Sequence, residues 1–216
     1  MNANEVLGYL KEHPEFLIQH AAELNIRVSE SKVRSFAEAQ IAATEKKIDN
    51  IAHNMAQVAQ NAEANKRTMQ RIFQLNLALL SCNTVSQVLK AVSGRLNNDF
   101  NLPNFCLLLT ENSRKKLTIP PEMQLNDNAL AERLASLNKP KCANKLIDEK
   151  LIKRLPDPDA ESFLHLPLRY NNRTVGVLVI GHKDPAYFAP DTPTEFVSQM
   201  GESIAAALAK MMGLNK

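Results

Sequence analysis

The sequence predicts an α+β protein in which a long amphipathic helix precedes a small antiparallel sheet flanked by helices. No Gly or Pro interrupts the chain from Ser31 until Gly94, and apolar residues recur at spacings of three and four along this stretch. Short apolar runs bounded by turn residues follow it. We therefore expect short N-terminal helices at 1–30, a long helix or coiled coil at 31–80, and a sheet domain at 81–216, its first helix continuous with the coiled coil.

The first thirty residues predict two short amphipathic helices. Val6, Leu7 and Leu10 share one helical face, and Pro14 marks a break or a second helix start before Phe16. Two such short helices have too little apolar surface to bury themselves alone.

The long helix carries a coiled-coil heptad pattern. With Ile41 at position a and Thr44 at position d, the pattern continues for more than five repeats, above the three or four that indicate a coiled coil. A continuous helix over residues 41–79 would extend roughly 58 Å at about 1.5 Å per residue. The residues at the a and d positions are Ile41, Thr44, Ile48, Ile51, Met55, Val58, Ala62, Asn65, Met69, Ile72, Asn76 and Leu79.

This pattern predicts a homodimer through residues 41–79, and polar interruptions predict that its strength is limited. Asn65 and Asn76 occupy seam positions, where a polar residue sets register at a cost in stability. The alternatives left open are packing of the helix on its own domain or on the N-terminal helices. The residues assigned to the dimer seam are Ile48, Ile51, Met55, Val58, Asn65, Met69 and Ile72.

Past Leu80 the pattern changes to that of a mixed domain. A turn at Asn83 precedes a helix of ordinary length, whose apolar face includes Val85, Val88, Leu89, Val92 and Leu96. The apolar run 104–110 predicts a buried strand, followed by a hairpin or loop to Ile119.

The rest of the domain alternates helix, irregular chain and hairpin. Leucines at helical spacing predict a helix over 125–137, capped by Asn126 or Asp127. Residues 138–160 are basic and irregular, and 161–184 predict an antiparallel hairpin that turns at its Asn-Asn pair. A last amphipathic helix is expected over 192–212.

Composition limits the classes of function. The chain has 216 residues, a formal net charge of +3 and three cysteines. This charge is too small for a nucleic-acid footprint, so the basic stretches Arg114–Lys116 and Lys141–Arg154 are interpreted as solvated loops, with a DNA-associated protein as a less favoured alternative. No apolar run reaches the length of a membrane span. We expect a cytoplasmic protein without membrane contact.

The histidines and cysteines do not form a catalytic or metal-binding pattern. No two histidines have metal-ligand spacing with a nearby cysteine, so no metal, cofactor or catalytic residue is expected. Cys106 lies in an apolar run and is interpreted as buried. Cys142 lies beside Lys141 and Lys145, whose charges are expected to lower the pKa of its thiol.

The order of elements and the C-terminal residues resemble a GAF domain, a small-molecule sensing module. A Pro-Leu pair, a Gly-containing strand, a loop with Phe and Asp and an amphipathic helix carry this resemblance. These residues are Pro167, Leu168, Gly176, Leu178, Phe188, Asp191, Phe196 and Leu208.

More narrowly, the chain resembles the bacterial domain-of-unknown-function family 484, which joins an N-terminal motif, a coiled coil and a GAF-like domain. The resemblance covers nearly the whole chain and implies a GAF-like antiparallel sheet and an oligomer. The matching residues are Tyr9, Leu10, His13, Pro14, Glu15, Phe16, Asp184, Pro185, Phe188, Gly201 and Glu202.

The GAF resemblance implies a ligand pocket on the sheet and a non-enzymatic regulatory function. We expect an unidentified small molecule or protein partner, with a structural interaction scaffold that binds no small ligand as the alternative. A thiol-dependent reductase of free methionine sulfoxide is a less favoured reading, because such chemistry needs an exposed thiolate of low pKa. The expected ligand-binding residues are Phe105, Leu107, Leu109, Phe163, His165, Val177 and Val179.

Overall fold

The computed structural model describes residues 2–13, 15–25 and 30–214. Pro14 of the N-terminal motif lies outside the described residues. Contacts divide the chain into two compact units, Met1–Ala64 and Asn65–Lys216, and the helix α3 (Glu30–Leu80) contributes residues to both.

The first unit contains two short helices before α3. Asn2 begins α1 (Ala3–Glu12) with a capping box, in which the backbone N–H of Glu5 donates to Asn2 Oδ1 at 2.9 Å. The helix α2 (Glu15–Gln19) follows, and the rings of Tyr9 and Phe16 meet edge to face at 5.5 Å between centroids. No residue of α1 is buried.

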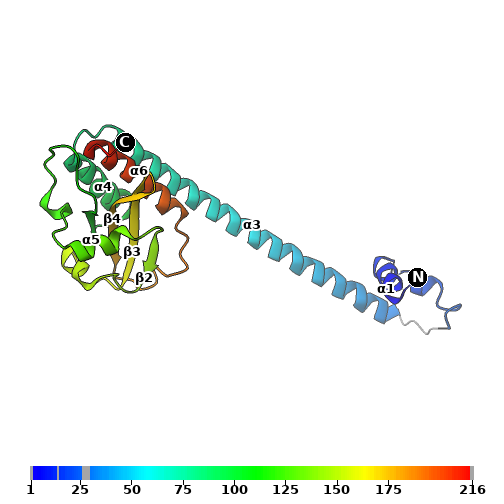
Figure 1. The fold of residues 1–216 in the computed structure, drawn as a ribbon. Coiled ribbons are helices and arrows are strands. Elements are labelled where there is room, and N and C mark those ends of the chain that lie inside the picture. Colours follow the sequence, from blue (N-terminus) through cyan, green and yellow to red (C-terminus); the bar gives the residue numbers. More distant parts are fainter. Residues whose placement is uncertain (1, 14, 26–29, 215–216) are drawn as a thin grey trace. The chain divides into compact units, whose positions relative to one another are not determined.

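The second unit holds the antiparallel sheet and its flanking helices (Figure 1). Its four strands pair in the order β1-β4-β3-β2, and each neighbouring pair is antiparallel. After α3, the elements of this unit are α4 (Val85–Phe100), β1 (Phe105–Leu109), η1 (Pro121–Met123), α5 (Asn128–Ala135), β2 (Lys141–Ala143), η2 (Glu149–Arg154), β3 (Ser162–Tyr170), β4 (Arg173–His182) and α6 (Glu195–Met212).

Local capping and turn chemistry explain where these elements begin and end. Thr84 caps α4 by accepting the N–H of Gln87, and Asp127 caps α5, as one of the two predicted caps. Asn171 and Asn172 join β3 to β4 with φ values of 46° and 62°, the left-handed conformation that a tight hairpin turn requires. The predicted hairpin and its turn are confirmed.

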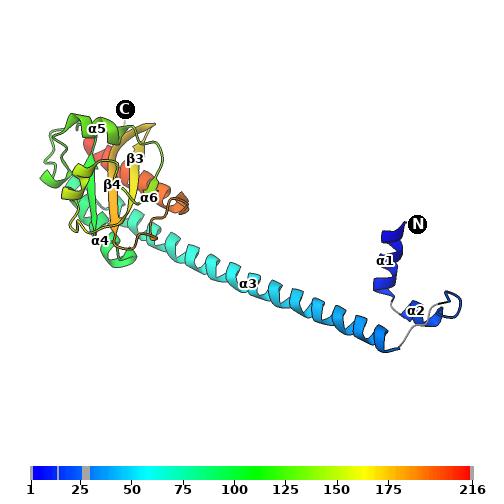
Figure 2. The ribbon, with the colours of Figure 1, turned by 90° about the horizontal axis from the view of Figure 1, so that it is seen from below.

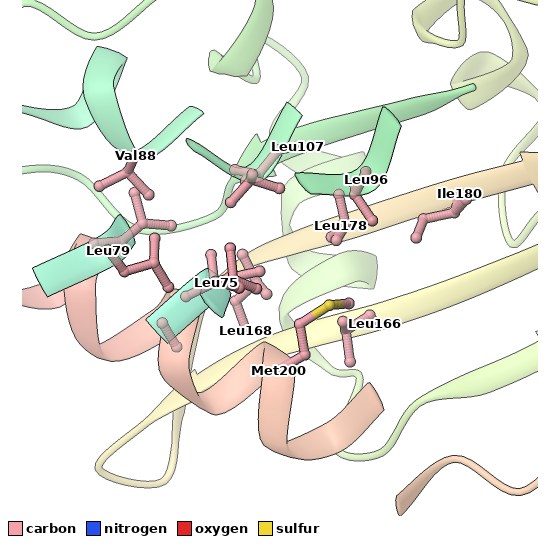
Figure 3. Close-up of a cluster of buried hydrophobic side chains, with 14 of the residues drawn as sticks. Leu75, Leu79, Val88, Leu96, Leu107, Leu166, Leu168, Leu178, Ile180 and Met200 are labelled. Carbon is pink, nitrogen blue, oxygen red and sulfur yellow. The ribbon is translucent and has the colours of Figure 1, made fainter. Parts of the chain in front are cut away.

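The sheet buries side chains on both faces, so it separates two hydrophobic cores. On one face α4, α6 and the end of α3 cover the sheet, and this helix-side core includes Leu75, Leu96 and Leu178 (Figures 2 and 3). On the other face α5 and η2 cover it, and this α5-side core includes Leu134 and Leu151. The predicted α+β class, with a long helix before an antiparallel sheet flanked by helices, is confirmed.

The region predicted to be irregular has regular structure in two places. Lys141–Ala143 form the edge strand β2, and Glu149–Arg154 form the 3-10 helix η2, whose Leu151 is fully buried. A three-residue strand is too short to show alternation in the sequence. Between β1 and η1 the described chain is a loop, in which the N–H of Arg114 donates to the carbonyl of Met212 at 3.0 Å. No described helix has the length and apolar character needed to cross a bilayer.

Candidate functional site

The residues expected to line one ligand pocket lie on opposite faces of the sheet. Successive side chains of a strand point to opposite faces. Leu107 and Leu109 belong to the helix-side core, with the half-buried Phe105 packed against it. The other members lie on the α5 side, where Phe163, Val177 and Val179 are core residues and His165 is fully buried on β3. The expectation of one pocket formed by all seven residues is therefore wrong.

The α5 side of the sheet is filled by the protein's own side chains. Leu130 and Leu134 of α5 pack there with Leu151 and Leu155, from η2 and the residue after it. Their exposed fractions are between 0% and 6%. The segment 138–160 thus covers this face with leucines that belong to the core.

His165 has a structural role on this face. The N–H of Ile147 donates to its Nε2 at 3.3 Å, and its Nδ1 lies 3.4 Å from the carbonyl oxygen of Lys141. Because Nε2 accepts, the proton of the neutral ring lies on Nδ1 and points to that carbonyl. Burial lowers the pKa of His165 to about 4, although the bond to the Lys141 carbonyl raises it. The neutral imidazole fastens β2 and the loop after it to β3.

An apolar groove of about 390 Å³ opens on the helix side of the sheet. The helix α3 supplies one wall through Thr68, Arg71 and Ile72. The guanidinium carbon of Arg71 lies 5.6 Å from the ring centroid of Phe100, a distance typical of a cation–π contact. The remaining lining residues are Leu96, Leu102, Leu164, Ile180, Tyr187, Phe188, Thr192, Pro193, Phe196, Val197 and Met200.

Sequence reasoning missed this groove, although Phe188, one of its residues, is among those that carry the family resemblance. Phe188 is 6% exposed and lies in the helix-side core. The groove needs residues from α3, α4, the sheet and α6 together. No spacing within one element indicates such a set.

The loop between β4 and α6 is held by local hydrogen bonds, which give its polar residues structural roles. Asp184 Oδ1 accepts the N–H of Ala186, and His182 Nδ1 accepts the N–H of Asp184. The fully buried Ser162 donates its hydroxyl to the carbonyl of Asp184 at 2.7 Å. The His182 and Tyr187 rings stack with centroids 3.9 Å apart.

A second, polar groove of about 880 Å³ lies at the hairpin end of the sheet domain. Glu202 of the family motif and Arg169 of β3 line it. Arg169 donates from its two terminal nitrogens to the carbonyls of Asn138 and Asn172, each at 3.3 Å. The guanidinium therefore ties the hairpin turn to the segment after α5.

The three cysteines are buried, which corrects the expectation for Cys142. Burial raises the pKa of its thiol, and its 7% exposure is inconsistent with an accessible thiolate. Burial likewise raises the pKa of Cys82, and it raises that of Cys106 to about 12. The described residues contain no group of three or more His, Cys, Asp and Glu side chains placed to hold a metal ion.

The predicted dimer seam of α3 changes character along the helix. In the first unit, Ile48, Ile51, Met55 and Val58 are 59–69% exposed and form an apolar row without a partner in the described chain. In the second unit, Asn65 is exposed, and so is Met69. Ile72, however, is 7% exposed, because the helix packs on its own domain there.

Comparison with known proteins places the chain in a family. It belongs to the family described as "Protein of unknown function, DUF484", whose model matches residues 1–212. This match confirms the resemblance drawn from the N-terminal and C-terminal motifs. A protein of Salmonella typhimurium strain LT2, "Uncharacterized protein YigA", is 24% identical over 203 residues, covering 90% of this chain and 86% of that protein.

GAF domains are among the solved structures that this chain is similar to. The native GAF domain of the potassium sensor histidine kinase KdpD from Escherichia coli matches at 17% identity, with a TM-score of 0.45, over 68% of this chain and 96% of its own. The GAF domain of a phosphoenolpyruvate-protein phosphotransferase from Coxiella burnetii matches at 17% identity, with a TM-score of 0.47, over 69% and 98%.

Proposed function

We propose that this protein is a non-enzymatic cytoplasmic regulator, in which a GAF-like domain binds a small molecule and α3 joins two copies through residues 41–79. One observation carries the proposal. The helix that forms a wall of the apolar groove also presents an exposed apolar row at heptad spacing. A ligand in the groove would contact the same helix that contacts the second copy.

The apolar groove supports small-molecule binding by its lining. Aromatic and aliphatic side chains make up most of its wall, and Arg71 is the one charged residue among those that line it. Ligand sites in proteins combine such an apolar lining with a few polar groups that orient the ligand. We expect a largely apolar ligand with an acceptor or anionic end toward Arg71.

Coupling between groove and helix would act through Ile72. This residue lines the groove and is itself nearly buried, so a ligand that displaces it shifts the packing of α3 on the sheet domain. Such regulation requires two arrangements of the helix with different affinity for the ligand. The proposed change is in the register or stability of the paired helices.

Native mass spectrometry of the full chain purified from its own host tests the ligand. We expect a retained small-molecule mass, which Val197→Trp removes by filling the groove. Gln199→Trp is the matched control, because Gln199 is exposed on the same helix and does not line the groove. A mass that persists in Val197→Trp would show that the ligand binds elsewhere.

A structural scaffold without a small ligand is the second candidate. The filled α5-side core favours it, since that face of the sheet is occupied by leucines. Wild-type protein that co-purifies with another protein and retains no small-molecule mass in native mass spectrometry would support the scaffold over the sensor.

The buried thiols of raised pKa support a non-enzymatic function over thiol reductase chemistry. An assay with free methionine sulfoxide and a dithiol reductant tests this directly. Turnover that disappears with Cys142→Ser would overturn it.

A further inference from the structure

The last turns of α3, within the sheet domain, expose an apolar surface of their own. Met69, Phe73, Leu77 and Leu80 are 57%, 58%, 46% and 76% exposed, and we call them the outer stripe. Spacings of four, four and three residues place them along one side of the helix. Large apolar side chains this exposed and this close together are typical of a protein contact surface.

A neighbouring side of the same turns packs on the sheet domain. Ile72, Leu75 and Leu79 are 7%, 1% and 5% exposed, and Leu75 and Leu79 belong to the helix-side core (Figure 3). The helix is therefore apolar on two sides at once. A helix that is hydrophobic all round is normally covered all round. Within the described chain the outer stripe has no cover.

Charge is nearly absent around the outer stripe. Residues 68–89 contain one charged residue, Arg71, in a chain with 23% charged residues. The Arg71 guanidinium is directed over the Phe100 ring. Depletion of charge is characteristic of the centre of a protein interface. A second copy of this chain fits such a surface, because residues 68–89 of each copy bring Arg71 as their one charged side chain.

We propose that residues 69–80 of two copies pair in parallel and in register through the outer stripe. This rests on the proposed dimer, but within the sheet domain it keeps only Met69 of the heptad seam and assigns the rest of the contact to Phe73, Leu77 and Leu80. Val58, Met69 and Leu80 are spaced by 11 residues, which is about three helical turns. The apolar positions thus follow an 11-residue spacing here, while the heptad positions Ile72 and Leu79 belong to the chain's own core.

Asn65 favours the parallel, in-register arrangement. It is exposed on α3 at a seam position. In a parallel pair its amide faces the same amide of the second copy, and each amide can both donate and accept. An antiparallel pair that overlaps the two apolar stretches of α3 would place this amide against apolar side chains, leaving it unsatisfied.

Cysteine cross-linking of the full chain tests the orientation, because the three native cysteines are buried. In the proposed arrangement, oxidation links two copies of Leu80→Cys, and also two copies of Phe73→Cys. Gln74→Cys is the matched control, since Gln74 is exposed one residue further round the helix. We expect it to link much more slowly. Equal rates at positions 74 and 80, or no linkage at 80, would overturn the proposal.

Charge substitution separates the outer stripe from the seam. Sedimentation of Phe73→Lys is expected to show a dimer dissociation constant raised at least about tenfold, equivalent to about 1.4 kcal/mol. Ile51→Lys tests the seam of the first unit in the same assay. A dimer broken by Ile51→Lys but unchanged by Phe73→Lys would overturn the outer stripe and leave the proposed dimer standing. Dissociation by Phe73→Lys alone would support the stripe and count against the seam.

Discussion

Acidification is expected to weaken the fold through His165. The ring is fully buried and neutral, it accepts the N–H of Ile147, and its Nδ1 faces the carbonyl of Lys141. Burial, the largest cause, lowers its pKa from 6.5 to about 4. Protonation would place a charge in the α5-side layer and give Nε2 a proton directed at the N–H of Ile147.

The direction of this pH effect follows from whether the unfolded or the native chain binds the proton. Between pH 6.5 and about 4 the unfolded chain binds a proton that the native chain does not, so the free energy of unfolding falls as the pH falls. The stabilisation that the neutral His165 ring contributes is fully present above pH 6.5. Below about pH 4 protonation of this ring lowers the free energy of unfolding no further. At about 1.4 kcal/mol for each pH unit, the full loss is on the order of 3 kcal/mol.

Urea unfolding at a series of pH values from neutral to pH 4 measures this contribution. In His165→Gln the side-chain oxygen can still accept the N–H of Ile147, while the titrating group is gone. We expect this variant to lose about 1 kcal/mol at neutral pH, through the missing second hydrogen bond, and to show a shallower pH dependence. His53→Gln is the control, because His53 is exposed on α3. Identical pH profiles for His165→Gln and wild type would refute the reasoning.

Three further predictions concern packing and thiol access. Gly201→Ala is expected to cost about 1–3 kcal/mol in urea unfolding, because its Cβ would lie 2.9 Å from Leu166 Cδ1; Gly94→Ala, with nothing within 4 Å, is expected to gain about 0.5–1 kcal/mol. The opposite order would contradict the packing of α6 on β3. Ile72→Ala is expected to cost about 2–4 kcal/mol in unfolding of the sheet domain, and Met55→Ala close to none, since Met55 is 69% exposed. All three thiols are expected to react with an aromatic disulfide reagent only as the chain unfolds; one equivalent reacting quickly in the native protein would contradict their burial.

The sequence predicts those parts of the fold that depend on local chemistry. A long stretch without Gly or Pro predicts α3, an aspartate before a leucine series predicts the α5 cap, and an Asn-Asn pair between apolar runs predicts the hairpin turn. Leu151 and the strand β2 could not be predicted this way. Their structure depends on contacts with residues distant in the chain, such as Phe163, which pairs with Ala143 across the sheet.

The candidate site was harder to predict, because both faces of this sheet are buried. When one face meets solvent, alternation of polar and apolar residues identifies the inward face. Here β4 is apolar through Val175, Val177, Leu178, Val179 and Ile180, so the sequence carries no mark that separates the two sides. The residues expected to share one pocket therefore came from both faces of the sheet.

The heptad of α3 is ambiguous for a related physical reason. Apolar residues at a and d spacing satisfy a partner helix and a domain core equally well, since both need one apolar side. Ile72 and Leu79 continue the repeat of Ile51 and Val58, yet they are buried in the chain's own domain. What separates the two uses is the neighbouring side of the helix. Near Ile51 the heptad row is the sole side of the helix with large apolar residues, whereas near Ile72 a second apolar series off the heptad, with Phe73 and Leu80, remains exposed. A repeat that keeps its period while a neighbouring side becomes apolar is therefore evidence that the helix has entered its own domain.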